Sequence, residues 1–519
     1  MKIERTKNAV RSITAGFGLR IYQTVVPFLM RTVMIHCLGV EYLGLNSLFS
    51  SILHILNLAE LGVGVAMVFS MYKPVAEDDI SKICALMRLY RRYYRLIGLF
   101  IGAVGLALTP FIPHLISGEV PAGINVYVLY LLNLGATVVS YWLFAYRNCL
   151  LSAYQRRDVS SLITILTSAV QNVLQLFILL WMKDYYLYVI VLLLGTALNN
   201  VVTGLVTMRM FPQCRPEGEL APVEKQQING KIRDLFTAKL GAVVLNYADT
   251  IVMSAFLGLT VLAVYQNYYF ILSAVLAVIE MMIGSITAGL GNSFVTESRE
   301  KNYRDLLKFT FLFLWMTGIC VCCFLALYQP FMEIWMGAEL MLPFGLVICF
   351  AVYFYVYTLN RLLSIYKDAA GLWHQDRFNP LTCAAVNLAL NLLLVKPLEL
   401  YGVQLATIVV LGGISIPWQL HNLFTLFFER GQFGRFARLI GKFLLLTAAS
   451  GICTALICSQ IRLGLWPTLL VCMAICLIVS NVLFLIFLRR DEQFRPAVQF
   501  VDRLTKRRLK LEKLLFREK

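Results

Sequence analysis

Stretches of about 20 apolar residues recur along the whole chain, and this recurrence constrains the fold more than any other feature. Each stretch is long enough to cross the ~30 Å hydrocarbon core of a bilayer as an α-helix. Fourteen such windows lie at roughly 14–36, 44–70, 94–116, 124–147, 160–182, 187–210, 236–257, 264–290, 306–328, 343–366, 381–396, 402–426, 440–460 and 466–488. The composition agrees, since 59% of the 519 residues are hydrophobic and the mean hydropathy is +0.73. The sequence therefore predicts an all-α polytopic membrane protein with fourteen transmembrane helices.

The distribution of charge predicts how these helices are oriented. Most of the 46 Lys and Arg residues lie in alternate connections between the apolar windows, which the positive-inside rule assigns to the cytoplasm. With an even number of helices, both termini are then cytoplasmic and the protein lies in the cytoplasmic (cell) membrane. The net charge of +17 follows from this topology and favours contact with anionic lipid, so no nucleic-acid partner is expected.

Several classes of function are disfavoured by what the chain lacks. It has no P-loop motif, so it is not a self-contained ATP-driven pump of that type. The 13 cysteines and five histidines show no spacing typical of a metal site, and no nucleophile and base are arranged for hydrolysis. We therefore expect no enzyme activity, no metal site and no cofactor. The cysteines are interpreted as small packing residues.

The chain also repeats itself. Landmarks separated by 219 residues are Phe17 and Phe236, Arg20 and Lys239, Gly39 and Gly258, Gly118 and Gly337, and Asn172 and Asn391. Because each half holds six helices, the halves enter the membrane with the same orientation, as parallel repeats with substrate between them. The predicted domains are an N-lobe at 1–214, a C-lobe at 215–429, and a segment at 430–519 with two further helices and a basic tail.

The tail and the first apolar window carry unusual patterns. In the tail, Val501, Leu504, Leu511 and Leu515 predict an amphipathic helix on the anionic inner leaflet. In the first window, the polar and helix-perturbing positions share one narrow helical face; they are Arg20, Gln23, Pro27 and Arg31. Cations at membrane depth normally face a protein interior or a watery cavity. The alternative is that each arginine extends to a headgroup layer.

Polar side chains also form stripes on other predicted helices. The candidates for a sugar pathway are Gln23, Asn46, His54, Asn57, Asn133, Gln266, Tyr353, Tyr357 and Asn360. Amide, hydroxyl and aromatic groups of this kind suit a sugar, but they also form hydrogen bonds between helices in lipid, and both interpretations stay open.

Three carboxyl groups, Glu60, Asp249 and Glu280, fall within apolar windows. They are candidate proton or counter-ion sites, with H+ or Na+ as the coupling ion. Asp249 lies at nearly the same predicted depth as Arg31, which suggests an ion pair that changes with conformation. Glu60 has a second interpretation near the cytoplasmic headgroups, and Arg361 is interpreted as extending to that layer.

Two segments carry a resemblance to a known family. They are YLGLNSLFSSILHILNLAELGVGVAMVFSMYKPVAEDDISKI with RRYYRLIG, within 42–98, and QPFMEIWMGAE at 329–339. They resemble the Wzx-type polysaccharide flippases of the multidrug/oligosaccharidyl-lipid/polysaccharide (MOP) exporter superfamily, in the variety found in Gram-positive bacteria. The resemblance implies a V-shaped bundle of two six-helix repeats plus two C-terminal helices.

The resemblance also implies an activity. Such a protein moves an undecaprenyl-pyrophosphate-linked oligosaccharide across the cytoplasmic membrane by alternating access, for capsule, exopolysaccharide or O-antigen biosynthesis. Cations in the family's cavity hold the pyrophosphate, and Arg20, Arg31 and Lys239 match by position. Expected partners are the lipid-linked oligosaccharide, membrane lipids, a polysaccharide polymerase and glycosyltransferases.

Three alternatives stay open. A lipid II flippase is poorly separated by sequence. A cation-coupled multidrug exporter of the same superfamily would favour an acidic cavity and twelve helices. A non-transporting scaffold for polysaccharide assembly would make the intramembrane charges dispensable.

Overall fold

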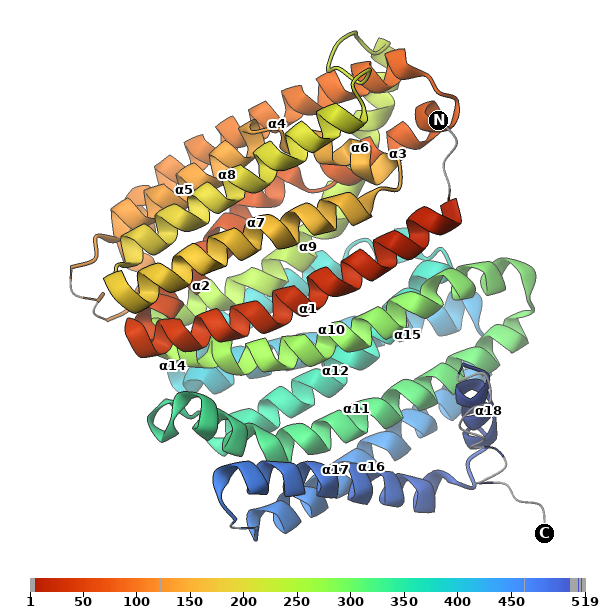
Figure 1. Ribbon diagram of the computed structural model, residues 1–519. Coiled ribbons are helices and arrows are strands. Elements are labelled where there is room, and N and C mark those ends of the chain that lie inside the picture. Colours follow the sequence, from red (N-terminus) through yellow and green to blue (C-terminus); the bar gives the residue numbers. More distant parts are fainter. Residues whose placement is uncertain are drawn as a thin grey trace. The chain divides into compact units, whose positions relative to one another are not determined.

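In a computed structural model, the described residues are 5–118, 120–121, 123–461, 463–504, 512 and 515, and they form helices and connections with no strand (Figure 1). The longer helices are α1 (Arg5–Cys37), α2 (Val40–Leu56), α3 (Val63–Ala76), α4 (Ile80–Leu108), α5 (Val126–Trp142), α7 (Arg157–Phe177), α8 (Tyr185–Met210), α9 (Pro222–Leu257), α10 (Leu259–Thr296), α11 (Arg299–Met336), α12 (Phe344–Ala369), α14 (Asn379–Val410), α16 (Phe433–Ser459), α17 (Leu465–Leu488) and α18 (Phe494–Leu504). The shorter helical segments are η1 (Asn57–Glu60), η2 (Thr109–Leu115), η3 (Ala145–Arg147), α6 (Asn148–Ala153), η4 (Ile178–Met182), η5 (Ala338–Leu340), α13 (Trp373–Asp376), η6 (Leu411–Ser415), α15 (Ile416–Asn422), η7 (Leu423–Phe427) and η8 (Arg430–Gln432).

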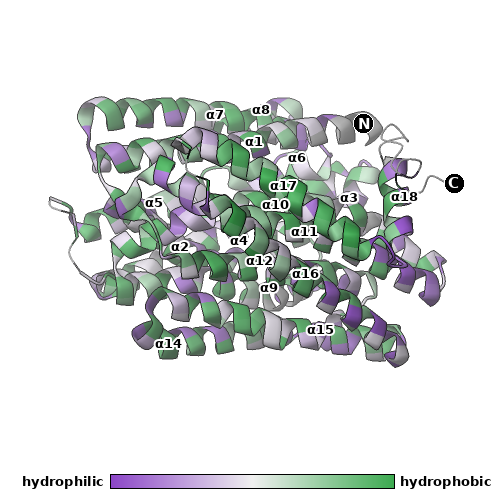
Figure 2. Cartoon of the chain, turned by 90° about the horizontal axis from the view of Figure 1, so that it is seen from below, coloured by the Kyte–Doolittle hydropathy of each residue, from purple (hydrophilic) through white to green (hydrophobic). Residues whose placement is uncertain are grey.

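Within the described residues, 11 helical stretches are long and apolar enough to cross a membrane, or 12 if the bent pair Val126–Trp142 and Ala145–Ala153 counts as one span. Figure 2 shows hydrophobic residues along most of the length of helices such as α11 and α17. The chain is thus a multi-pass, all-α membrane protein, as predicted. The count of fourteen stays a prediction, because α1 is not among these stretches and Trp373–Phe427 is one stretch of 55 residues.

The chain divides into two compact units, 1–263 and 264–519. In the first unit, α1 packs along α7, and Asn172 donates a 2.7 Å hydrogen bond to the Tyr22 hydroxyl. Helix α9 packs along α2, and Ser254 near its end donates to the carbonyl of Leu115 at 2.7 Å. The predicted domain boundaries after residues 214 and 429 stay predictions.

Four glycines support the predicted internal repeat at the level of local backbone. Gly39 and Gly258 have φ of +118° and +90°, and Gly118 and Gly337 have +83° and +85°. Each pair is 219 residues apart. Glycine is favoured at such φ values because a side chain would be strained there. These four glycines therefore all have a positive φ, and the internal repeat itself stays a prediction.

In the second unit, α11 contacts α12, α16, α17 and α18. It approaches α17 so closely that a Cβ added at Gly318 would lie 2.5 Å from the Phe484 ring. Cys458, Cys472 and Cys476 are buried in a hydrophobic cluster with Ala326, and all 13 cysteines are free.

The first part of the basic tail forms α18, and the membrane-surface helix predicted over residues 501–515 stays a prediction. Phe494, Ala497 and Val498 of α18 are buried. The Phe494 ring stacks on Trp315 of α11, with centroids 6.0 Å apart. The apolar face of α18 is therefore covered by protein, because aromatic side chains of α11 lie against it. The predicted residues Leu504 (its side chain) and Leu511 lie outside the described part.

Candidate functional site

In the first unit, the carboxylate of Glu60 is positioned by a break between two helices. Helix α2 ends in the single turn η1, which contains Glu60, and α3 begins after Gly62. Gly62 has a φ of +87°, and a Cβ there would lie 2.7 Å from Leu235 of α9. The site therefore requires glycine for both its backbone conformation and its space.

Neutral hydroxyl groups hold this carboxylate. Tyr94 donates to Oε1 at 2.5 Å and Tyr141 donates to Oε2 at 2.7 Å, while Tyr90 donates to the Tyr94 hydroxyl at 2.7 Å. All three tyrosines are buried. Among the described residues, no Lys, Arg or His forms an ion pair with Glu60. Hydrogen bonds to a charged acceptor are stronger than neutral ones, so this network holds Glu60 firmly.

The three predicted phosphate-binding cations also belong to the first unit. Arg20 on α1 is exposed, whereas Arg31 on α1 and Lys239 on α9 are half-buried. Arg31 lies close enough to the Tyr188 hydroxyl for an electrostatic interaction. To the described residues, the Arg20 and Lys239 side chains make no hydrogen bond or ion pair. Their charges are thus available to an anion.

The polar residues predicted on α1, α2, η1 and α5 have differing surroundings. His54 is exposed and stacks on Tyr247 of α9, with centroids 4.6 Å apart and planes 12° apart. Asn57 Oδ1 is buried and, within the described part of the chain, accepts no hydrogen bond. Asn133 is buried and donates to the carbonyl of Leu129 on its own helix at 2.9 Å. Gln23 is exposed, and Asn46 is half-buried.

In the second unit, Glu280 on α10 meets two groups from α12. The Tyr357 hydroxyl donates to Glu280 Oε1 at 2.8 Å, and Arg361 Nε lies 3.4 Å from the same oxygen. The Glu280 and Arg361 side chains are 39% and 43% exposed, whereas the Arg361 Nε atom itself is buried. Arg361 thus has an acidic partner on the neighbouring helix α10, and its predicted extension to the headgroup layer stays a prediction.

The remaining predicted residues are distributed as follows. Tyr353 is buried and its ring lies 5.7 Å from that of Tyr357. Asn360 is buried and donates to Ser415 Oγ at 2.7 Å. Gln266 on α10 and Asp249 on α9 are half-buried. The predicted pairing of Asp249 with Arg31, and the assignment of all these residues to one pathway, stay predictions.

Sequence reasoning identified the two carboxylates but missed their partners Tyr94, Tyr141 and Arg361. The segment RRYYR, at 91–95, contained a signal, because a tyrosine four residues after Tyr90 lies on the same helical face. Its basic neighbours favoured a cytoplasmic interpretation instead. Which side chains contact each carboxylate is visible only in the three-dimensional structure.

Comparisons with known proteins show the fold. No protein-family model matches the sequence, and the search of curated proteins found no match. A solved structure of the lipid II flippase MurJ in an inward closed conformation has a TM-score of 0.68 at 15% identity, covering 92% of this chain and 99% of that chain. An inward-facing multidrug resistance MATE family transporter of the MOP superfamily has a TM-score of 0.61 at 15% identity, covering 83% and 99%. A eukaryotic MATE transporter has 0.54 at 11% identity, covering 84% and 98%.

These likenesses show the fold of the chain, which is that of MOP-superfamily transporters.

Proposed function

We propose that this protein is a flippase that moves an undecaprenyl-pyrophosphate-linked oligosaccharide across the cytoplasmic membrane for cell-surface polysaccharide biosynthesis. One observation carries the proposal: the first unit of a transporter fold holds Arg20, Arg31 and Lys239, and neither Arg20 nor Lys239 is neutralised by a described residue. A diphosphate headgroup cannot cross hydrocarbon unaided, and fixed cations would replace its hydration. The Wzx-type assignment is part of this proposal.

The proposal includes fourteen helices in two parallel six-helix repeats plus two. It is supported by α1, whose 33 residues exceed the length needed to cross. It is also supported by the 55-residue stretch, which is long enough for two crossings and has non-helical backbone at Glu399. With the bent pair Val126–Trp142 and Ala145–Ala153 counted as one span, α1 and a division of the 55-residue stretch would raise the count from 12 to fourteen. The matched glycine turns support the repeat.

The sharpest test changes the cations one at a time. Arg20→Gln, Arg31→Gln and Lys239→Gln should each slow flipping about ten-fold, because a charge-assisted hydrogen bond contributes ~1.5–3 kcal/mol. The measurement is flipping of the fluorescent lipid-linked oligosaccharide in proteoliposomes. Lys183→Gln is the matched control, since Lys183 is exposed in a connection of the same unit. Unchanged flipping by the triple variant would reject the proposal.

We also propose that carboxyl groups couple transport to H+ or Na+, with Asp249 changing partner during the cycle. Asp249→Asn should then reduce turnover without abolishing substrate binding, and should remove any dependence of flipping on an imposed pH or sodium gradient. If neither gradient affects the wild type and the variant flips normally, coupling through Asp249 is wrong.

Lipid II flipping is the second candidate, because the MurJ structure covers a larger share of this chain than the two MATE transporters described above. The two flippase hypotheses share the pyrophosphate and differ in the sugar. Competition in the same vesicles separates them: unlabelled lipid II should not inhibit flipping of the oligosaccharide substrate if the first proposal holds. Assembly with a polymerase and glycosyltransferases belongs to that proposal and would be tested by co-purification.

A further inference from the structure

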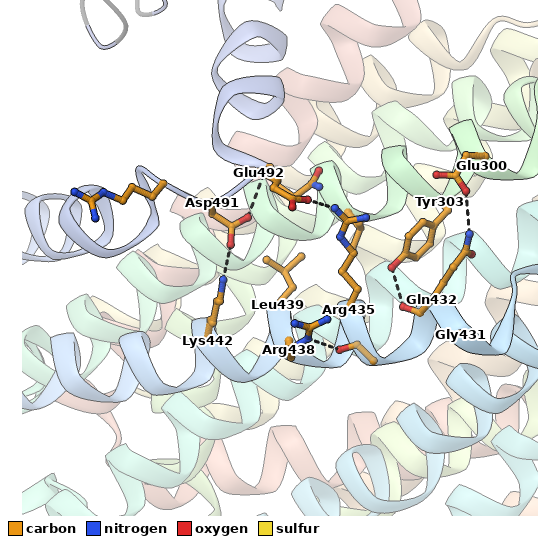
Figure 3. A pocket seen from close by; sticks show the side chains of 14 residues that line it. Glu300, Tyr303, Gly431, Gln432, Arg435, Arg438, Leu439, Lys442, Asp491 and Glu492 are labelled. Atoms are coloured by element: carbon orange, nitrogen blue, oxygen red, sulfur yellow. Dashed lines mark hydrogen bonds and ion pairs between the residues drawn. The ribbon is translucent and has the colours of Figure 1, made fainter.

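A polar pocket of about 730 Å³ lies in the second unit, apart from the cluster of Glu280. It is formed by the first turns of α11 and α16 and by the connection between α17 and α18 (Figure 3). Its charged lining includes four basic residues, Arg435, Arg438, Lys442 and Arg490, and three acidic ones, Glu300, Asp491 and Glu492. The pocket thus lies where spans end, at the depth expected for lipid headgroups.

The basic residues of α16 share one face of that helix. Arg435, Arg438 and Lys442 are spaced by three and four residues, so their side chains project to the same side. The first turn of α16 contains no acidic residue. Because the N-terminal end of a helix is itself electropositive, cations placed there raise the local potential further. This end of α16 is therefore suited to an anion.

The three cations differ in how they are neutralised. Lys442 Nζ lies 2.8 Å from Asp491 Oδ2, and Asp491 also accepts a 3.1 Å hydrogen bond from the Gln493 backbone. Asp491 is only 11% exposed, so it is fixed in place. Arg435 pairs with Glu492, which is 70% exposed. Arg438 donates only to the carbonyl of Gly434, and among the described residues it has no acidic partner. Arg438 is thus available, and Arg435 is held by a displaceable carboxylate.

An apolar stripe continues from this face of α16 away from the pocket. Leu445, Ile452 and Leu456 are 73%, 60% and 62% exposed in a helix that spans the membrane. They follow Arg438 and Lys442 at spacings that keep them on nearly the same side. A ligand with a phosphate in the pocket could place acyl chains along this stripe. A basic pocket next to an exposed apolar stripe favours a lipid over a soluble phosphate as the ligand.

We propose that this pocket binds the phosphate of an anionic phospholipid headgroup through Arg435 and Arg438, with Glu492 as the carboxylate that the phosphate displaces. Guanidinium groups donate two parallel hydrogen bonds to phosphate oxygens. The lipid would then join the N-terminal ends of α11 and α16 to the connection that leads into α18. This role is separate from the transported substrate.

Variants with opposite expected effects test the proposal. The full-length protein is purified in detergent, and binding of phosphatidylglycerol and phosphatidylcholine is measured by native mass spectrometry. Arg438→Gln and Arg435→Gln should each weaken phosphatidylglycerol binding about five-fold, because one basic residue near a lipid surface contributes ~1 kcal/mol. Glu492→Gln should strengthen it, since the competing carboxylate is removed. Arg438→Lys should restore part of the loss.

Arg430→Gln is the matched control, because Arg430 is exposed in η8 close to the pocket but does not line it. It should leave phosphatidylglycerol binding unchanged. Equal binding of the two lipids by the wild type, or equal effects of Arg438→Gln and Arg430→Gln, would overturn the proposal. Binding of inorganic phosphate at the same site with no preference for phosphatidylglycerol would overturn the lipid assignment. A thermal unfolding transition matching the wild type establishes that each variant is folded.

Discussion

Glu60 in the first unit and Glu280 in the second occupy comparable places in the two halves of the chain but are held differently. They are 220 positions apart, and they follow the positive-φ glycines Gly39 and Gly258 by 21 and 22 positions. Each accepts a hydrogen bond from a tyrosine, Tyr141 for the first and Tyr357 for the second. Glu60 has further neutral donors, whereas Glu280 has the cation Arg361.

Two carboxylates at comparable positions in the sequence thus have different electrostatic surroundings. Among the described residues, Glu60 forms no ion pair with a cation, although Arg20, Arg31 and Lys239 lie in the same unit. Glu280 is neutralised locally in a unit where none of these three cations lies. In the first unit, Arg20 and Lys239 have no acidic partner among the described residues, whereas the second unit pairs Glu280 with Arg361. A transporter that binds an anion in the first unit would have this asymmetry.

The largest expected effect comes from the backbone that positions Glu60. Gly62→Ala should lower the free energy of unfolding by on the order of 3 kcal/mol, because it combines strain at positive φ with overpacking against α9. Gly284→Ala is the control in the second unit: Gly284 lies in the continuous helix α10, and an added Cβ would meet nothing within 4 Å. That change should be neutral or stabilise by ~0.5–1 kcal/mol. Chemical unfolding of the two detergent-solubilised variants measures both changes. A similar loss of unfolding free energy in Gly62→Ala and Gly284→Ala would contradict the predicted difference between the units.

The next effect concerns the hydrogen bonds themselves. Tyr94→Phe should cost ~2 kcal/mol, because it removes a donor from a charged acceptor and leaves the buried Tyr90 hydroxyl without its acceptor. Tyr357→Phe should cost less than ~1 kcal/mol, since Glu280 is 39% exposed and keeps Arg361. Thermal unfolding measured side by side tests this order, and a larger loss for Tyr357→Phe would contradict it.

The smallest effect is expected at the ion pair. Arg361→Gln should change stability by less than ~1 kcal/mol, because both side chains are substantially exposed and exposed ion pairs contribute little. In flipping assays, this variant makes Glu280 resemble Glu60. Glu280 then keeps the neutral Tyr357 hydroxyl as a donor and loses its cation. A loss of more than ~2 kcal/mol would mean that the pair is far less solvated than its exposure indicates.

The locations of the helices could be predicted from sequence because the requirement to span a bilayer is local. About 20 apolar residues suffice to identify a span, and α11, α12 and α17 lie where the predicted windows at 306–328, 343–366 and 466–488 place them. The glycine turns were also visible, since only glycine adopts their φ readily. At the start of the tail, the Phe494 ring of α18 stacks on Trp315 of α11; the sequence alone does not show whether lipid or protein covers an apolar helix face.

The sequence by itself determined the class of this protein, its apolar spans and its intramembrane charges, because hydropathy and helical periodicity depend on neighbours in the chain. Tertiary structure decided what each charge contacts. The tyrosines that hold Glu60 lie 34 and 81 positions away, and the one that holds Glu280 lies 77 positions away. Such contacts depend on which helices pack together and at what rotation, so periodicity within one helix cannot specify them. The same is true of the pocket beside Arg438, which needs the first turns of α11 and α16 together with the connection between α17 and α18.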